Sequence, residues 1–240
     1  MRTRRLTVDP HAHSAGSYDA TGTVGELLAR ASAAGLDAIA VTDHDAIERS
    51  LRAVELAPSY GLLAVPGVEV STADGHLLAL GVDRCPPAGE SFARTVERVR
   101  DRGGVAVVPH PFERLRHGVR AAAVDDCDAV ETYNACSLLC VRRRAARRFA
   151  AERGYARVGG SDAHTPAMVG RAYTEVVVET TAAASEEVPV DAVLDAIRRG
   201  ATRARGRRTP VHRFVRKYAT NARLKTGALL ASQGATLTRR

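Results

Sequence analysis

Short apolar segments alternate with amphipathic helical segments over the first 200 residues, and this alternation constrains the fold more than any other feature. Residues 38–41, 62–65 and 105–108 are typical of buried strands, whereas residues 23–34 and 91–102 show helical periodicity. Strands that alternate with helices favour a mostly parallel sheet. We therefore predict an α/β protein with about seven strand–helix units.

One pair of segments departs from this alternation. Residues 68–72 and 77–82 flank Asp74-Gly75, which is a strong turn signal. The sequence therefore predicts a β-hairpin in the middle of the chain.

Histidine and acidic side chains follow the predicted strands. After residues 4–8 the chain reads Asp9-Pro10-His11-Ala12-His13, and the alternation of side chains along an extended chain places both histidines on one side. Two imidazoles directed at one point form half of a metal site. The same order recurs in Thr42-Asp43-His44-Asp45, Gly67-Val68-Glu69, Gly75-His76, Pro109-His110-Pro111 and Gly160-Ser161-Asp162-Ala163-His164.

A buried histidine can also be a hydrogen-bonded core residue. That interpretation does not account for six of the eight histidines at predicted strand ends, where α/β barrels place their active sites. His117 and His212 lie outside this pattern, and we interpret them as ordinary surface residues.

Composition limits the class of protein. The 240 residues suffice for one large domain, and with 45% hydrophobic residues, 4% aromatic residues and no Trp the core must consist mainly of Ala, Val and Leu. The sequence lacks an apolar run of roughly 18 residues or a signal-peptide core, so we expect neither a transmembrane segment nor export. The four cysteines lack C-x-x-C spacing, which favours reduced thiols in a cytoplasmic protein.

Positive charge is concentrated at the end of the chain. Residues 198–240 contain thirteen Lys and Arg and no Asp or Glu, although the net charge of the whole chain is +8. We therefore predict a catalytic domain over residues 1–199 and a basic extension over 200–240, with a polar linker, an amphipathic helix and a disordered end. Its helix could pack on the domain, contact nucleic acid or bind a membrane surface.

The motifs quoted above resemble, in order over residues 6–178, those of the PHP (polymerase and histidinol phosphatase) superfamily. The resemblance implies a distorted seven-stranded (β/α) barrel with a metal site at the C-terminal ends of its strands. It also implies a phosphoesterase with two to three divalent ions, which could be Mn, Zn, Fe or Mg. The segment Gly75-His76-Leu77 is similar to that of the stand-alone members rather than of polymerase-attached domains.

The resemblance also implies residue roles. His11, His13, Glu69 and Asp162 would hold a first ion, Glu69, His76 and His110 a second, and Asp19, His44 and His164 a third. Among these residues Glu69, Asp162 and His110 are the expected catalytic groups. Asp9 and Asp43 are expected to orient histidine rings.

Several substrates remain open. We expect hydrolysis of a nucleotide or short oligonucleotide phosphate by metal-activated water. The alternatives are a small-molecule phosphomonoesterase similar to histidinol phosphatase and a non-catalytic, nucleic-acid-binding PHP domain. Arg171 could clamp a phosphate or form a surface ion pair, and Asn134 and Glu131 could contact substrate or orient ligands. The arginines of residues 142–148 form either a solvated helix face or a path for substrate.

Overall fold

The computed structural model describes residues 2–137, 140–180, 188–208 and 210. Its ten strands pair in two five-stranded sheets with the orders β10-β9-β1-β2-β3 and β4-β5-β6-β7-β8. The first sheet contains β1 (Arg2–Ala12), β2 (Ala38–Val41), β3 (Leu63–Ala64), β9 (Ala172–Thr180) and β10 (Thr202–Gly206). The second contains β4 (Gly67–Thr72), β5 (Gly75–Leu80), β6 (Val105–Val108), β7 (Ala129–Asn134) and β8 (Ala156–Gly160).

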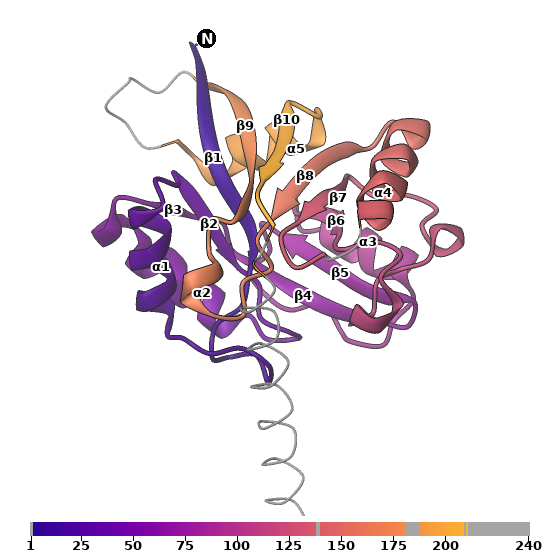
Figure 1. Cartoon of the computed structure of the whole chain (residues 1–240), viewed down its shortest axis with the longest axis horizontal. Coiled ribbons are helices and arrows are strands. Elements are labelled where there is room, and N and C mark those ends of the chain that lie inside the picture. Colours follow the sequence, from indigo (N-terminus) through magenta and orange to yellow (C-terminus); the bar gives the residue numbers. More distant parts are fainter. Residues whose placement is uncertain (1, 138–139, 181–187, 209, 211–240) are drawn as a thin grey trace, which may run out of the picture.

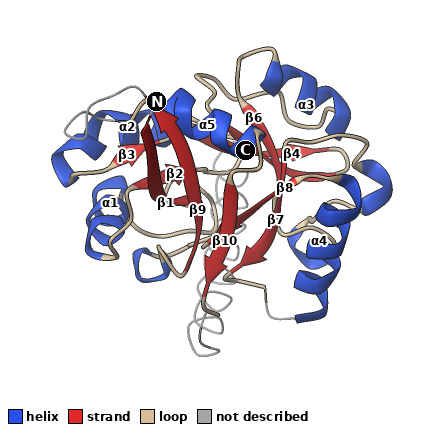
Figure 2. Ribbon diagram, turned by 90° about the horizontal axis from the view of Figure 1, so that it is seen from above, coloured by secondary structure: helices blue, strands red, loops and turns tan. Residues whose placement is uncertain are grey.

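Five α-helices accompany these strands in the described residues. They are α1 (Val24–Ala33), α2 (Glu48–Leu56), α3 (Phe92–Arg100), α4 (Cys140–Arg153) and α5 (Val190–Arg198). Figure 1 shows α1 and α2 on one side of the strands and α3 and α4 on the other, and Figure 2 shows the same arrangement from above. The predicted helices 23–34 and 91–102 are confirmed as α1 and α3.

The predicted seven-stranded (β/α) barrel is wrong. The described strands form two separate mixed sheets rather than one closed ring, and backbone pairing between the sheets is limited to isolated bridges, Ala12 to Ala163 and His44 to Glu69. Four of the strand pairs are antiparallel, including the predicted hairpin β4–β5 and the pairs of β9 with β1 and β10. A barrel of strand–helix units requires parallel neighbours throughout, and these antiparallel pairs break that pattern.

The two sheets share one hydrophobic core. Apolar side chains of β1, β2, β5, β6, β8 and β9 form a single buried cluster, which α5 completes through Val193, Leu194 and Ile197. These side chains are small or branched, as the near absence of aromatic residues predicts. Apolar side-chain contacts therefore hold the two sheets together where they lack backbone hydrogen bonds to each other.

The C-terminal extension begins differently from the prediction. Residues 202–206, expected in a polar linker, form β10 and pair antiparallel with β9. The predicted amphipathic helix and disordered end lie outside the described residues. Within the described parts of the chain, every helix is too short or too polar to span a membrane. The four cysteines, all in described segments, are free thiols.

Candidate metal centre

Strand ends from both sheets converge on one buried cluster. β1 and the loop after it carry His11, His13 and Asp19, and the loop after β2 carries His44. The other sheet provides the remaining five predicted ligands, which are Glu69, His76, His110, Asp162 and His164. His11, His13, Glu69 and Asp162 are at most 1% exposed, so the centre lies below the surface. The structure thus brings together all nine predicted ligands.

The first predicted group is compact. The Nε2 atoms of His11 and His13 lie 3.1 Å apart, as their alternation along β1 predicted. Glu69 Oε2 lies 3.3 Å from His11 Nε2 and 3.1 Å from His13 Nε2. Asp162 Oδ1 lies 3.7 Å and 3.5 Å from the same two nitrogens. Four ligand atoms therefore face one point.

The second group shares the Glu69 carboxylate with the first, and the third group lies beside His13 of the first. Glu69 Oε1 is 2.9 Å from both His76 Nδ1 and His110 Nε2, so its two oxygens face different histidines. Asp19 lies 3.0 Å from His164 Nε2 through Oδ2 and 3.7 Å from His44 Nε2 through Oδ1. The ligand atoms also form overlapping triads, which are His13-His44-His164, His11-Glu69-His110, His11-His13-Asp162 and His44-Glu69-His76.

The donor atoms of the first group fit a divalent ion. Metal–ligand bonds of about 2.0–2.2 Å in a tetrahedron place neighbouring ligand atoms about 3.3–3.6 Å apart. The observed separations among His11, His13, Glu69 and Asp162 lie between 3.1 and 3.7 Å. Two imidazole nitrogens that face the same carboxylate oxygen are also more readily satisfied by a cation than by a single shared proton. Both the types of donor atom and the distances between them therefore fit a divalent ion.

Burial and neighbouring charges shift the pKa values of the clustered groups in opposite directions. Burial acts to lower the pKa of His11, but the carboxylates of Glu69 and Glu131 overcome it and raise that pKa to about 10. Burial acts to raise the pKa of Glu69, but His76 and His11 hold it well below its ordinary value. Burial lowers the pKa of His44 to about 3 and, with Arg116, that of His110 to about 4. Anionic Glu69 beside neutral His44 and His110 presents the protonation states that metal ligands require, whereas His11 must release a proton to bind a metal.

Comparison with known families agrees with this geometry. Residues 9–137 match the model of the PHP domain, and residues 142–202 match that of a PHP-associated segment. The chain belongs to the PHP family. The resemblance seen in the sequence motifs is thereby confirmed.

Relatives of this PHP chain include proteins of known and unknown activity. It is 31% identical over 110 residues to an uncharacterized protein of Methanocaldococcus jannaschii, covering 45% of this chain and 64% of that protein. It is 33% identical over 105 residues to a 3′,5′-nucleoside bisphosphate phosphatase of Chromobacterium violaceum, covering 40% of this chain and 36% of that enzyme.

A solved structure shows the same fold. It is a two-domain protein of Bacteroides vulgatus that contains a predicted PHP-like metal-dependent phosphoesterase, with a TM-score of 0.69 and 19% identity. The match covers 85% of this PHP chain and 65% of that protein. The chain thus spans less than two thirds of the length of each of these three proteins.

Glu131 fixes the orientation of one candidate ligand. Its Oε1 lies 3.2 Å from His11 Nδ1, and its Oε2 accepts hydrogen bonds from the His110 backbone N–H and the Asn134 amide. A carboxylate at Nδ1 holds the imidazole in the tautomer that leaves Nε2 free for a metal. Asn134 also donates to Asp162 Oδ2 at 3.0 Å, so its amide supports ligands.

Replacing Glu131 with glutamine is therefore expected to weaken Mn²⁺ binding by about 10–100-fold, because His11 loses the anion that orients it. Isothermal titration of Mn²⁺ into chelator-treated protein measures this directly. Glu179→Gln removes the same charge at an exposed position on β9, where Glu179 pairs with Thr3 at the opposite end of β1 from His11, and should leave the affinity unchanged. Equal affinities for Glu131→Gln and the wild type would contradict the assigned role.

The two aspartates predicted to orient histidine rings make no direct hydrogen bond to a ring among the described residues. Asp43 accepts hydrogen bonds from the Ser14 backbone N–H and the Ser17 hydroxyl, and Ser17 Oγ in turn lies 3.1 Å from His13 Nδ1. Asp43 therefore orients the His13 ring through Ser17. Asp9 accepts from the backbone N–H groups of Ser161 and Gly170, and its burial raises its pKa to about 6. Asp9 thus joins loops rather than orienting a ring.

Backbone conformation at the centre is unusual. His110 and Asp162 have positive φ angles of 27° and 51°, a region that residues with a side chain seldom adopt. The Asp162 N–H donates to the His11 carbonyl, and the His13 N–H donates to the Ala163 carbonyl, both at 2.8 Å. These bonds hold the loops of β1 and β8 together, and such constrained conformations concentrate at functional sites.

Sequence reasoning missed Arg116. This residue is largely buried in the loop after β6, and its guanidinium contacts Asp162 Oδ2 and lies 3.2 Å from Asn134 Oδ1. It stands in a run of charged residues, Glu113 to Arg116, which carries no signal of burial. His117, predicted to be an ordinary surface residue, is exposed, but its ring stacks on that of His76 with centroids 5.2 Å apart. Arg171 instead donates to the Arg208 carbonyl beyond β10.

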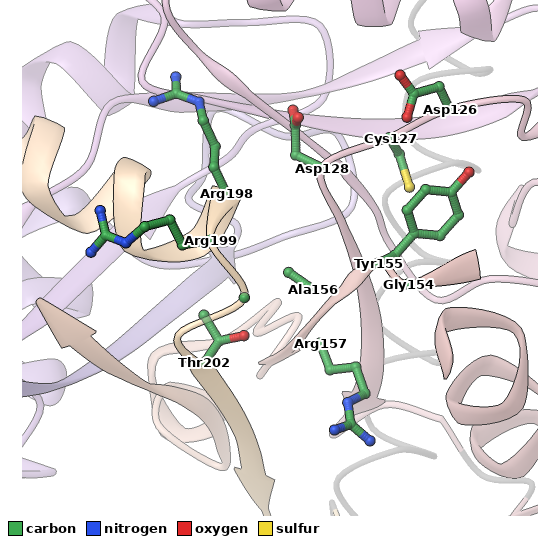
Figure 3. A pocket seen from close by; sticks show the side chains of 11 residues that line it. Asp126, Cys127, Asp128, Gly154, Tyr155, Ala156, Arg157, Arg198, Arg199 and Thr202 are labelled. Carbon is green, nitrogen blue, oxygen red and sulfur yellow. The ribbon is translucent and has the colours of Figure 1, made fainter. Parts of the chain in front are cut away.

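Two polar cavities differ in their relation to the centre. One of about 390 Å³ is lined by His76 together with Tyr18, Arg114, His117 and Arg120, and therefore opens beside the candidate ligands. Another of about 360 Å³, shown in Figure 3, lies at the amino ends of β7 and β8, and its lining includes none of the nine predicted ligands. Since β7 extends by roughly 3.3 Å per residue, this second cavity lies at the far edge of the sheet.

Proposed function

We propose that this PHP-family chain is a metal-dependent phosphoesterase that hydrolyses a phosphate ester of a nucleotide or short oligonucleotide. The observation that carries the proposal is the buried carboxylate of Glu69, whose two oxygens face His11, His13, His76 and His110 at 2.9–3.3 Å. A carboxylate placed between two sets of imidazoles is suited to bridging two cations. Two or three ions of Mn, Zn, Fe or Mg are the proposed cofactors.

The proposed ligand sets follow the three groups described above. His11, His13, Glu69 and Asp162 hold one ion, Glu69, His76 and His110 a second, and Asp19, His44 and His164 a third. Such ions, when bound, offset the charge of a phosphate and lower the pKa of water. Among the protein groups, Glu69, Asp162 and His110 are the proposed catalytic residues.

The adjoining cavity supports a phosphorylated substrate. Arg114 and Arg120 line it and supply positive charge beside His76. The Tyr18 ring stacks on that of His44 with centroids 5.1 Å apart and is 57% exposed, so it offers an aromatic face to a base. The similarity to a 3′,5′-nucleoside bisphosphate phosphatase favours a nucleotide as well. The alternative of a smaller phosphomonoester, as in histidinol-phosphatase-like enzymes, leaves this aromatic face unused.

A substrate panel tests the proposal. We expect Mn²⁺-supplemented protein to release phosphate or nucleotide from a 3′,5′-nucleoside bisphosphate or a short oligonucleotide at least tenfold faster than from p-nitrophenyl phosphate. The reason is that the small ester lacks a base for Tyr18 and a second phosphate for Arg114 and Arg120. A preference for the small ester would favour the alternative phosphomonoesterase. Absence of turnover on every substrate with Mn²⁺, Mg²⁺, Zn²⁺ and Fe²⁺ would refute the proposed activity.

Contact between the basic C-terminal extension and nucleic acid also remains a proposal. It is supported by the thirteen Lys and Arg of residues 198–240, without any Asp or Glu, which suit a polyanion.

A further inference from the structure

α4 carries a continuous stripe of positive charge. Its fourteen residues include six arginines and a single carboxylate, Glu152. At 3.6 residues per turn, Arg144, Arg147 and Arg148 lie on the exposed side of the helix, away from the buried residues Ala146, Phe149 and Ala150, and the half-buried Arg143 flanks them beside Ala150. We call these four arginines the α4 stripe.

The charge pattern of α4 opposes the stability of the helix itself. Arg143 with Arg147 and Arg144 with Arg148 are like-charged pairs at i and i+4, each unfavourable by about 0.2–0.5 kcal/mol. The first turn holds Arg142 and Arg143 and no acidic residue, although the positive end of the helix dipole lies there. These like-charged placements therefore do not stabilise the helix.

Within the described residues, the outer arginines have few anionic partners. Arg148 pairs with Glu152 at 2.6 Å, whereas Arg142, Arg144 and Arg147 are exposed and form no ion pair with a described carboxylate. Unpaired guanidinium groups on one face favour binding to a polyanion, because their hydrogen-bond donors match phosphate oxygens.

The stripe begins close to the metal centre. The Arg143 guanidinium lies over the Tyr133 ring, 4.7 Å from its centroid, and donates to Cys140 Sγ at 3.4 Å. Arg208, beyond β10, contacts the same sulfur. Tyr133 precedes Asn134, whose amide donates to Asp162 Oδ2. Because α4 begins six residues after Asn134, the last residue of β7, a chain of phosphates lying on α4 would lead toward the edge of the sheet that holds the candidate ligands.

We propose that the α4 stripe binds the backbone of a single-stranded nucleic acid whose terminal phosphate lies at the metal centre. The inference deepens the proposed function and rests on it for the reaction, whereas binding to the stripe requires no turnover. A membrane surface is the less suitable partner, because an interfacial helix buries an apolar face in lipid. The apolar face of α4 is already buried within the protein through Ala146, Phe149 and Ala150.

The test is the salt dependence of binding, measured on the full chain with EDTA present. A fluorescent 12-nucleotide single strand of RNA is titrated with protein at several salt concentrations and followed by anisotropy. Arg144→Gln/Arg147→Gln/Arg148→Gln should reduce the slope of log K against log [salt] by about 2, at about 0.7 per lost phosphate contact. Affinity at about 0.1 M salt should fall at least tenfold.

A matched variant separates the stripe from net charge. Arg52→Gln/Arg84→Gln/Arg94→Gln removes three exposed arginines elsewhere and should change affinity less than twofold. Replacing the same three arginines of the stripe, Arg144, Arg147 and Arg148, with lysine should leave the slope of log K against log [salt] unchanged. An unchanged slope in the glutamine variant, or equal losses in both triple variants, would overturn the proposal. So would undiminished RNA binding accompanied by loss of binding to phosphatidylserine vesicles. Because no metal is present, failure of the proposed hydrolysis leaves this measurement intact.

Discussion

Glu69→Gln is expected to reduce phosphoester hydrolysis by about a thousandfold or more, equivalent to ~4 kcal/mol of lost transition-state stabilisation. The two carboxylate oxygens of Glu69 face His11 and His13 on one side and His76 and His110 on the other. Glutamine has nearly the same shape, but one of its terminal atoms becomes an N–H₂ donor without ligand capacity. One substitution therefore weakens both proposed ion sites, since they share this residue.

The measurement combines kcat/KM on the best substrate of the panel with the metal content of the purified variant. We expect a loss of at least one equivalent of metal alongside the loss of rate. Asp19→Asn alters only the third group and should cost considerably less. Since Glu69 is buried, thermal unfolding of each variant shows whether it folds. A folded Glu69→Gln protein with wild-type metal content and rate would disprove the bridging role.

Removal of metal by a chelator is expected to abolish activity and lower the melting temperature. Without cations, Glu69, Glu131 and Asp162 are buried acidic groups, and in the described part of the chain their charge faces imidazoles and Arg116. A ligand that binds only the folded state stabilises it by about 4 kcal/mol at a thousand times its dissociation constant. Mn²⁺ returned to the dialysed protein should restore both activity and melting temperature.

Metal analysis of protein purified without chelator provides the independent measure. More than one equivalent of divalent metal is expected, because the proposed sites have three or four ligands each. Ca²⁺ serves as a control, since an imidazole-rich site suits it poorly. Metal content near zero, with no rescue of activity by added Mn²⁺, would disprove the proposed centre.

Much of the candidate site was predictable because its residues follow strands. Side-chain alternation predicted that His11 and His13 face one point, and the recurrence of His and Asp after apolar runs predicted that distant segments meet. The supporting residues were harder to predict. The role of Glu131 depends on its proximity to a residue 120 positions away, and the burial of Arg116 depends on how one loop folds over Asp162.

The pairing and direction of the strands were less predictable than their positions in the sequence. The ranges 38–41 and 105–108 coincide with β2 and β6, because local apolar pattern determines where a strand forms. Strand direction depends on distant partners. β9 pairs antiparallel with β1 from the other end of the chain, and β10 lies in a segment whose Arg-rich composition is typical of a linker. Hence the sequence pattern favoured a parallel barrel that the structure lacks.

The separation into two sheets has a mechanical consequence for the metal centre. His11, His13, Asp19 and His44 belong to one half of the molecule, whereas Glu69, His76, His110, Asp162 and His164 belong to the other. Between these halves the ladder is reduced to single bridges at Ala12–Ala163 and His44–Glu69. Ions held by ligands from both halves would cross-link the two sheets at the boundary between them. Metal binding would then slow amide exchange along the boundary between the sheets more than inside either sheet, because the proposed ions would limit local opening at that boundary.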